Sequence, residues 1–354
     1  MKKFILSIAA IAALTACSKS HIEYNEPSEI AVAPVAQNIT KGMVTSTTFP
    51  EETFNLWAYY KPVKNATIAN WQADESKQQT YIDNKTFTKK GDGTWGGAEA
   101  AYYWPKDGSL MFAGYFPSSL KDVTYDFSST QNIMTIPDYT PGMVTTAEKD
   151  HSEDVMYFNM TAKSYTSGPV PVTFRHALSW ITVKLAKSTD TPSDATITVN
   201  SVQFTEIFKT GTGTVNNSPV APATNEITWA TAEGTKGILE VCPDDKTTTD
   251  TKENVVTLTT TATALEKEPI IIPQTMTGNL VVNYTITSED GSSFTETKTI
   301  ALRGMNATDS GTSKQLTDWQ PAKHYTYTIT IGTTEILIQP TVDIWKEVTI
   351  GTTI

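Results

Sequence analysis

The chain has few of the residues from which disulfide frameworks and metal centres are built. It contains 2 cysteines and 4 histidines in 354 residues, and it has neither a Cys-x-x-Cys nor a His-x-x-x-His spacing. The sequence therefore predicts no zinc site and no other bound metal or cofactor. The two cysteines are Cys17, directly after the leader described below and expected to be acylated, and Cys242, in an apolar strand-like run. We expect no disulfide in the mature chain and interpret Cys242 as a small buried hydrophobe.

Positive charge is also scarce. Lys and Arg number 27 against 38 Asp and Glu, which gives a formal net charge of −11. An acidic chain without basic clusters lacks the electrostatic attraction that nucleic acids and anionic lipid headgroups require. We therefore expect the protein to bind neither nucleic acids nor anionic lipid headgroups.

No window of helical length shows a 3.6-residue apolar period. Short alternating segments rich in Val, Ile and Thr follow one another instead, separated by Gly, Pro, Asn or Asp. This spacing predicts an all-β fold of the sandwich type with Greek-key connections, and the length suggests two domains. A compact Arg-His-Ala-Leu turn at residues 175–178 interrupts the alternation. We place the junction there, with one β-sandwich over 42–175 and a second over 176–354.

Signatures of catalysis are missing. There is no Gly-x-Ser-x-Gly elbow, and His176 is the one histidine in a constrained setting, the turn itself. A packing or hydrogen-bonding role for His176 is favoured over a catalytic one. The sequence thus predicts a protein that is not an enzyme and has no catalytic residue.

The first residues have the pattern of a bacterial lipoprotein signal. Lys2 and Lys3 precede an apolar run over 4–13 that is too short to span a bilayer, and small residues lead to Cys17. Residues 1–16 are therefore predicted to be a signal peptide. Acylation of Cys17 would anchor the chain to a membrane without a spanning helix.

Both ends of the mature chain contain strand-like segments. Residues 17–41 are interpreted as a tether followed by a strand, in which Pro34 requires an edge position or a strand end. The last strand, over 336–350, is long and apolar, and it must pair either with its own domain or with an open sheet of another chain. Its alternating apolar side chains are Ile336, Ile338, Val342, Ile344, Val348 and Ile350.

Five motifs together carry a resemblance to a known family. In order they are FNLWAYY at 54–60, YWP with GSLMFAGYFP at 103–117, TFRHALS at 173–179, IPQT at 272–275 and WQPAKHYTY at 319–327. With the leader, this order resembles the fimbrillin-like (Mfa-like) lipoproteins, which are type V pilus subunits. The resemblance implies two transthyretin-like β-sandwich domains and removal of an N-terminal strand by a trypsin-like protease, often an arginine-specific one. It also implies that the opened groove accepts the C-terminal strand of the next subunit.

Carried onto this chain, the resemblance assigns the removable strand to Glu29–Gln37 and the scissile bond to Lys41-Gly42. The donor strand would be 336–350. The basic residue at the expected bond is a lysine, whereas the two arginines, Arg175 and Arg303, lie far downstream. Two alternatives follow: a lysine-tolerant protease acts, or the protein is never trimmed and serves as a lipid-held anchor or assembly subunit.

The expected partners are other pilin subunits, bound by strand complementation, and the outer membrane, reached through the lipid on Cys17. The expected location is the cell surface. A further alternative is a module that binds glycans or other host or bacterial surface ligands, since the chain has 8 Trp and 14 Tyr residues. Most of these rings are expected to fill the cores of the two sandwiches instead.

Overall fold

The computed structural model describes residues 24–33, 53–64, 66, 79–128, 132–145, 154–164, 168–216, 227–242, 256–265, 267–309, 311–344 and 348–350. Throughout these ranges the regular structure is β-strand, apart from one 3-10 turn, η3 (Glu233–Thr235). The all-β class predicted from the alternation is confirmed.

The N-terminal lobe is built on a sheet that closes on itself. Its strands are β2 (Val32–Ala33), β3 (Phe54–Lys61), β4 (Gln79–Lys89), β5 (Trp95–Gly97), β7 (Ser109–Phe116), β11 (Met156–Ser164), β12 (Val170–His176) and β29 (Val348–Ile350). Their order is β11-β7-β3-β4-β5-β2-β12-β29, and β12 also pairs with β11. The ring is thus continuous from β11 around to β12, and β2 is the strand that joins β5 to β12. Beside it lies an antiparallel pair, β1 (Tyr24–Glu29) with β6 (Tyr103–Pro105).

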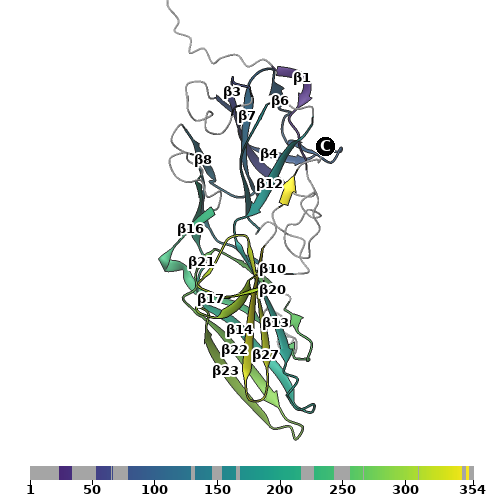
Figure 1. Ribbon diagram of the computed structural model, residues 1–354, viewed down its shortest axis with the longest axis vertical. Coiled ribbons are helices and arrows are strands. Elements are labelled where there is room, and N and C mark those ends of the chain that lie inside the picture. The colour runs from purple at the N-terminus through teal and green to yellow at the C-terminus, as the bar shows by residue number, and fades with distance from the viewer. Residues whose placement is uncertain are drawn as a thin grey trace, which may run out of the picture.

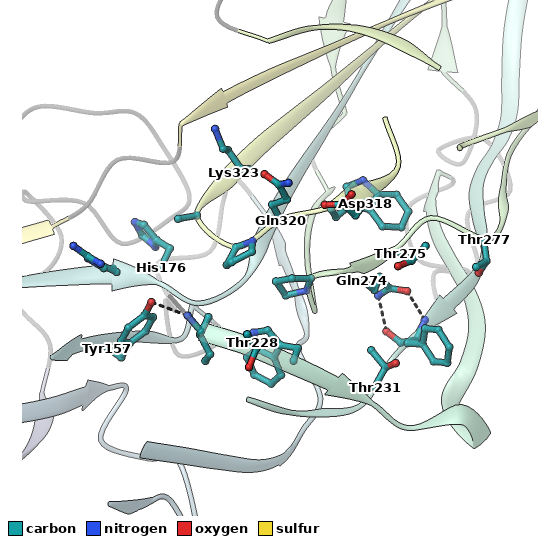
Figure 2. A pocket seen from close by; sticks show the side chains of 18 of the residues that line it. Tyr157, His176, Thr228, Thr231, Gln274, Thr275, Thr277, Asp318, Gln320 and Lys323 are labelled. Carbon is teal, nitrogen blue, oxygen red and sulfur yellow. Dashed lines mark hydrogen bonds between the residues drawn. The ribbon is translucent and has the colours of Figure 1, made fainter. Parts of the chain in front are cut away.

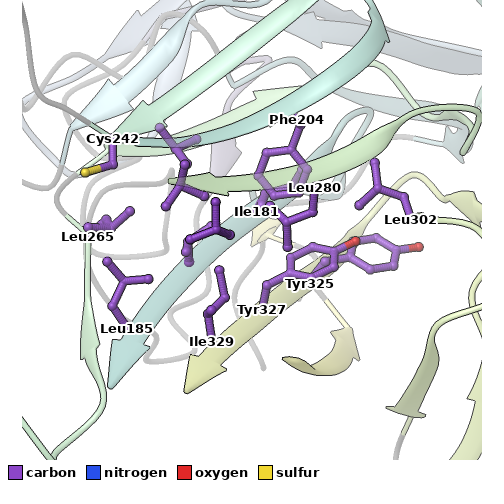
Figure 3. Close-up of a cluster of buried hydrophobic side chains, with 14 of the residues drawn as sticks. Ile181, Leu185, Phe204, Cys242, Leu265, Leu280, Leu302, Tyr325, Tyr327 and Ile329 are labelled. Atoms are coloured by element: carbon purple, nitrogen blue, oxygen red, sulfur yellow. The ribbon is translucent and has the colours of Figure 1, made fainter. Parts of the chain in front are cut away.

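The C-terminal lobe is a sandwich of two sheets. One contains β10 (Met143–Thr145), β13 (Ser179–Lys187), β19 (Thr263–Ala264), β20 (Lys267–Ile271), β24 (Asn306–Asp309), β25 (Thr312–Gln315), β27 (Lys323–Ile331) and β28 (Ile336–Ile344). The other contains β14 (Thr196–Phe208), β17 (Lys236–Cys242), β18 (Val256–Thr257), β22 (Asn279–Thr287) and β23 (Ser293–Ala301). Apolar side chains from both sheets form one core, seen in Figure 3, and Cys242 lies in it with 3% of its surface exposed. The interpretation of Cys242 as a small buried hydrophobe agrees with this position.

A smaller sheet connects the lobes. It consists of β8 (Thr124–Phe127), β9 (Asn132–Tyr139), β15 (Gly211–Asn216) and β16 (Ile227–Thr231), in the order β16-β15-β9-β8. A further short pair joins β21 (Gln274–Thr275) to β26 (Asp318–Trp319). Strands from both halves of the sequence meet in the connecting sheet, and β10 from the first half pairs with β20 of the second. The predicted boundary between residues 175 and 176 falls at the last residue of β12, and two residues separate β12 from β13, which lies in a different sheet.

The two lobes lie end to end along the long axis of the molecule, as Figure 1 shows, with β16 near the middle. Strands β3 and β7 are buried along almost their whole length rather than on alternate positions. One set of their side chains, including Leu56 and Phe112, faces the core of the N-terminal lobe. The other set, including Trp57 and Met111, packs in a separate cluster with residues of β9, β13 and β16. The two faces of these strands therefore serve both the lobe's own core and the junction between lobes.

Candidate interaction site at the two ends of the chain

The segment before residue 34 enters the N-terminal lobe as the strand that closes its ring. Val32 lies opposite Trp95 in the antiparallel neighbour β5 and opposite Val170 in the parallel neighbour β12. Ala33 lies opposite Pro171. Because Pro171 has no amide proton, this position of β12 is suited to the end of a ladder. Strand β2 is accordingly only two residues long.

Two backbone hydrogen bonds fix the two residues that precede β2. The amide of Ile30 donates to the carbonyl oxygen of Tyr102 at 2.7 Å, and the amide of Val170 donates to the carbonyl oxygen of Ala31 at 2.7 Å. The side chains of Ile30 and Val32 both have 0% of their surface exposed. An alternating pattern with isoleucine and valine on the inner face produces this arrangement, because successive side chains of an extended chain point to opposite sides.

The cavity that receives these two side chains is aromatic. Ile30 and Val32 belong to the core cluster of the N-terminal lobe together with Phe54, Phe87, Trp95, Trp104, Phe158, Val170, Val172 and Phe174, among others. Phe54 contacts Phe174 edge-on, with ring centroids 5.2 Å apart, and it stacks on Phe87 at 5.8 Å. The inner face of β12 is therefore part of the same cluster as the N-terminal segment.

The long C-terminal strand divides into two strands that pair with different sheets. Residues Ile336–Ile344 form β28, which pairs antiparallel with β27 over nine positions. Side-chain burial along β28 is uneven: Ile336 and Ile338 are half-buried against the core of the C-terminal lobe, Val342 is buried, and Ile344 is 63% exposed. This part of the expected donor strand is an integral strand of its own lobe.

Residues Val348 and Ile350 lie in β29, on the N-terminal lobe. Strand β29 pairs antiparallel with β12, with Val348 opposite Phe174 and Ile350 opposite Val172. The structure therefore brings part of the expected donor strand and part of the expected removable strand onto one strand, β12. Cys17, Lys41 and Gly42, the expected lipidation and cleavage residues, lie outside the described residues.

Two features of this site were not predicted from the sequence. The first is the division of the last strand after Ile344; the charged residues Lys346 and Glu347 in an otherwise apolar run are the signal that marks it in the sequence. The second is the role of β12 as the shared partner. Pro171 within an alternating run hints at a strand that is incompletely paired along one stretch.

The Arg-His-Ala-Leu segment, residues 175–178, connects the lobes and takes part in several hydrogen bonds. His176 is buried, and its Nδ1 atom lies 3.0 Å from Oδ1 of Asp154, which is buried as well. The indole Nε1 of Trp229 donates to the carbonyl oxygen of Ala177 at 2.8 Å, and the amide of Ala322 donates to the carbonyl oxygen of Leu178 at 3.0 Å. The packing and hydrogen-bonding role expected for His176 agrees with this geometry.

A groove of about 870 Å³ opens beside this turn. Part of its lining comes from three of the five sequence motifs, represented in Figure 2 by His176, Gln274 and Lys323. The carboxamide of Gln274 accepts from the amide of Phe208 at 2.8 Å and donates to the carbonyl oxygen of Phe208 at 3.0 Å. Gln274 thus completes backbone pairing in the groove wall. A structural reason for the IPQT motif follows, because these bonds join β14 to the short pair of β21 and β26.

A buried polar chain crosses three strands of the C-terminal lobe. His324 stacks on Trp180 with ring centroids 3.6 Å apart, and its Nε2 lies 2.8 Å from Oγ1 of Thr182. Thr182 in turn donates to Oε1 of Glu268 at 2.9 Å. Burial, followed by the charge of Lys184, lowers the pKa of His324 to about 4. Burial also raises the pKa of Glu268, although hydrogen bonds from Thr182 and Trp180 act in the opposite direction.

Within the described ranges, no group of three or more His, Cys, Asp or Glu side chains is placed to hold a metal ion. The described part of the chain also contains no helix long and apolar enough to cross a membrane.

These observations define an all-β protein of two lobes in which both chain ends meet on one strand of the N-terminal lobe. The family model described as fimbrillin-like matches residues 43–345, and the chain belongs to that family. No curated protein matches the sequence.

Several solved structures match the chain at low sequence identity. A fimbrial protein from Bacteroides vulgatus matches with a TM-score of 0.58 and 17% identity, over 89% of this chain and 100% of that chain. A structure from Bacteroides uniformis, named for cell adhesion, matches with a TM-score of 0.49 and 16% identity, over 90% and 98%. The tip fimbrial protein Mfa3 from Porphyromonas gingivalis, truncated at its C-terminus, matches with a TM-score of 0.36 and 11% identity, over 90% and 99%. The likeness to the first of these concerns the fold alone.

Proposed function

We propose that this protein is a structural subunit of a cell-surface fimbria, exported as a lipoprotein through Cys17 and assembled by strand exchange. In this proposal a protease cuts the Lys41-Gly42 bond, the segment containing β2 leaves, and another subunit's C-terminal strand takes its place. Membership of the fimbrillin-like family supports a fimbrial subunit at the cell surface. The observation that carries the mechanism is the position of β2, as a two-residue strand that closes the ring between β5 and β12.

The energetics favour a replaceable strand. Complete burial of an Ile or Val side chain is worth about 1.5–3 kcal/mol, so Ile30 and Val32 together contribute roughly 3–6 kcal/mol. Their departure would leave an apolar slot lined by Trp95, Val170 and other core residues. It would also leave the carbonyl oxygen of Tyr102 and the amide of Val170 without their present hydrogen-bond partners, Ile30 and Ala31. Unpaired backbone groups beside an apolar slot are a strong template for an incoming strand.

The chemistry of assembly follows from geometry and needs no catalytic group. A donor strand restores the backbone ladder and inserts alternate apolar side chains, while its own chain presents a fresh slot at its other end. Contact of this head-to-tail kind does not close on itself, so it builds a filament. The Thr-rich exterior and the acidic charge suit a polymer exposed to solvent.

The proposal is tested with the chain from Ser18 onward, cleaved after Lys41 by a limiting amount of trypsin-like protease. Mass spectrometry of the product establishes where the cut occurred. We expect the cleaved chain to form a ladder of oligomers by size-exclusion chromatography, whereas the uncleaved chain stays monomeric. A cleaved product that remains monomeric at high concentration would falsify strand exchange for this protein.

A second candidate is a lipid-held anchor that is never cut, which the presence of lysine rather than arginine at position 41 favours. The two candidates differ in the N-terminal residue of the protein recovered from cells. Acylated Cys17 on all of the protein indicates an anchor, whereas Gly42 indicates a trimmed subunit.

A glycan-binding module is favoured less, because Trp57, Trp104 and Trp180 have at most 7% of their surfaces exposed. Rings buried to this extent are not open for stacking on a sugar. A glycan array that gives hits, together with cleaved protein that does not polymerise, would reverse this preference.

A further inference from the structure

Strand β12 pairs with both ends of the chain along five consecutive residues. Val170 and Pro171 lie opposite Val32 and Ala33 of β2, and the next three residues, 172–174, pair with β29. The two segments run in opposite directions, since β2 is parallel to β12 and β29 is antiparallel to it. The N-terminal segment and the chain's own C-terminal strand therefore occupy adjoining stretches of one partner strand.

The same apolar core lies beneath both stretches. Val170, Val172 and Phe174 have at most 2% of their surfaces exposed, and all three belong to the cluster that contains Ile30 and Val32. Residues 172–174 of β12, with which β29 pairs, therefore directly follow the two residues of β12 that the departure of β2 would leave unpaired with it.

The pairing of β29 is short but intramolecular. It covers three positions of β12, whereas β28 covers nine positions of β27. Because each backbone hydrogen bond adds only a small net stability in water, three ladder positions are readily exchanged. Only residues 345–347 separate β28 from β29, and a tether this short gives a high effective concentration of the strand at its own β12.

We propose that β29 is the donor strand held in a stored state: a free subunit keeps its C-terminal strand on its own β12 and must release it before a second copy of the chain can receive it. This inference rests on the proposed function and adds its regulation. Removal of β2 alone does not make the subunit an efficient donor, because its C-terminal strand is already paired. Exchange becomes favourable when another subunit has lost its β2. The C-terminal strand can then be buried between β5 and β12 of that subunit, and it gives up only its three ladder positions on its own β12.

A reversible disulfide tests the stored state. In the chain from Ser18 onward, Thr173→Cys and Thr349→Cys place two thiols at positions that lie opposite each other in β12 and β29. The natural Cys242 is buried in the other lobe and is present in every sample. The matched control is Val281→Cys with Thr299→Cys, which also lie opposite each other but in β22 and β23 of the C-terminal lobe. Each variant is cleaved after Lys41 while oxidised, and assembly is followed by light scattering before and after addition of a reductant.

We expect the oxidised β12–β29 pair to form within monomers and to slow assembly at least tenfold, with full recovery on reduction. The control disulfide should leave the assembly rate unchanged. Equal assembly of the oxidised and reduced forms, or failure of the pair to oxidise within monomers, would overturn the stored state while leaving strand exchange intact. If the reduced variants and the unmodified cleaved chain all stay monomeric, strand exchange itself is overturned and the stored state falls with it.

Discussion

The two ends of the chain are held in opposite ways. At the N-terminal end, Ile30 and Val32 are completely buried, yet β2 is two residues long. At the C-terminal end, β28 pairs over nine positions, yet Leu337 and Ile344 have 50% and 63% of their surfaces exposed. The first end is held mainly by side chains and the second mainly by backbone. This contrast is compatible with the proposed removal of the N-terminal segment, whereas β28 stays in its lobe and β29 pairs with β12.

A consequence concerns the pairing of β28 itself. Its second neighbour, β24, pairs only with Thr341 and Val342, just after Pro340. Among the described residues, Ile336–Gln339 therefore have β27 as their single ladder partner. Pro340 lies where β28 changes from one ladder partner to two. A proline is tolerated there because its missing amide proton costs no hydrogen bond on the side that has no neighbouring strand.

The largest expected effect comes from truncating the two buried side chains of the N-terminal segment. Ile30→Ala with Val32→Ala removes two fully buried side chains, so the free energy of unfolding should fall by about 4 kcal/mol or more. Urea unfolding monitored by the fluorescence of the N-terminal lobe's tryptophans measures the loss. A loss below about 1 kcal/mol would mean that the backbone, rather than these side chains, holds this end.

Acid should weaken the C-terminal end rather than the N-terminal one. His324 lies opposite Asp343 of β28, and its pKa of about 4 is below its ordinary value near 6.5. Between pH 6.5 and 4 the unfolded chain binds a proton at this histidine more readily than the folded chain does. The folded state is therefore at its full stability above pH 6.5 and loses stability relative to the unfolded state as the pH falls toward 4. The loss amounts to at most about 3 kcal/mol, and the raised pKa of Glu268 offsets part of it because its burial becomes less costly in acid.

The check is urea unfolding at pH 7 and pH 4.5 for the natural chain and for His324→Gln. The natural chain should lose more stability between the two pH values than the variant does. Parallel losses in both proteins would show that His324 is not responsible.

The junction tests whether the two ends belong to one cooperative unit. The amide of Ile227 donates to the hydroxyl of Tyr157 at 3.0 Å in a buried contact between β16 and β11. Tyr157→Phe leaves this amide without its acceptor, which should lower the free energy of unfolding by about 1–3 kcal/mol. Hydrogen exchange should report the same loss at β2 and at β28; a loss confined to one lobe would show that the lobes unfold separately.

The smallest effect is expected from the exposed apolar side chains of the C-terminal end. Leu337→Ala with Ile344→Ala should change the free energy of unfolding by only about 0.5 kcal/mol, since neither side chain is well buried. This pair is the counterpart of the N-terminal double variant in size and chemistry. A loss comparable to that of the N-terminal pair would erase the contrast between the two ends.

The sequence predicted the strand content and the apolar alternation of both ends, because a period of two residues is a local property. It also identified the turn around His176 as a constrained connection. The pairing of β29 with β12 was beyond local reasoning, since Val348 and Phe174 are brought together only by the packing of two lobes. The continuous burial of β3 and β7 was likewise hidden, because alternation does not reveal that both faces of a strand are covered. Lipidation of Cys17 and cleavage after Lys41 remain predictions.

The exchange of strands between the lobes has a mechanical consequence. Strand β10 lies in the C-terminal sheet although it precedes β11 and β12, and β15 returns to pair with β9 while β16 pairs with β15. The chain therefore crosses between the lobes several times, and a pull along the long axis loads several strands at once instead of peeling them apart one by one. If subunits are joined in the proposed filament, tension along it would therefore be shared among several strands at the junction within each subunit.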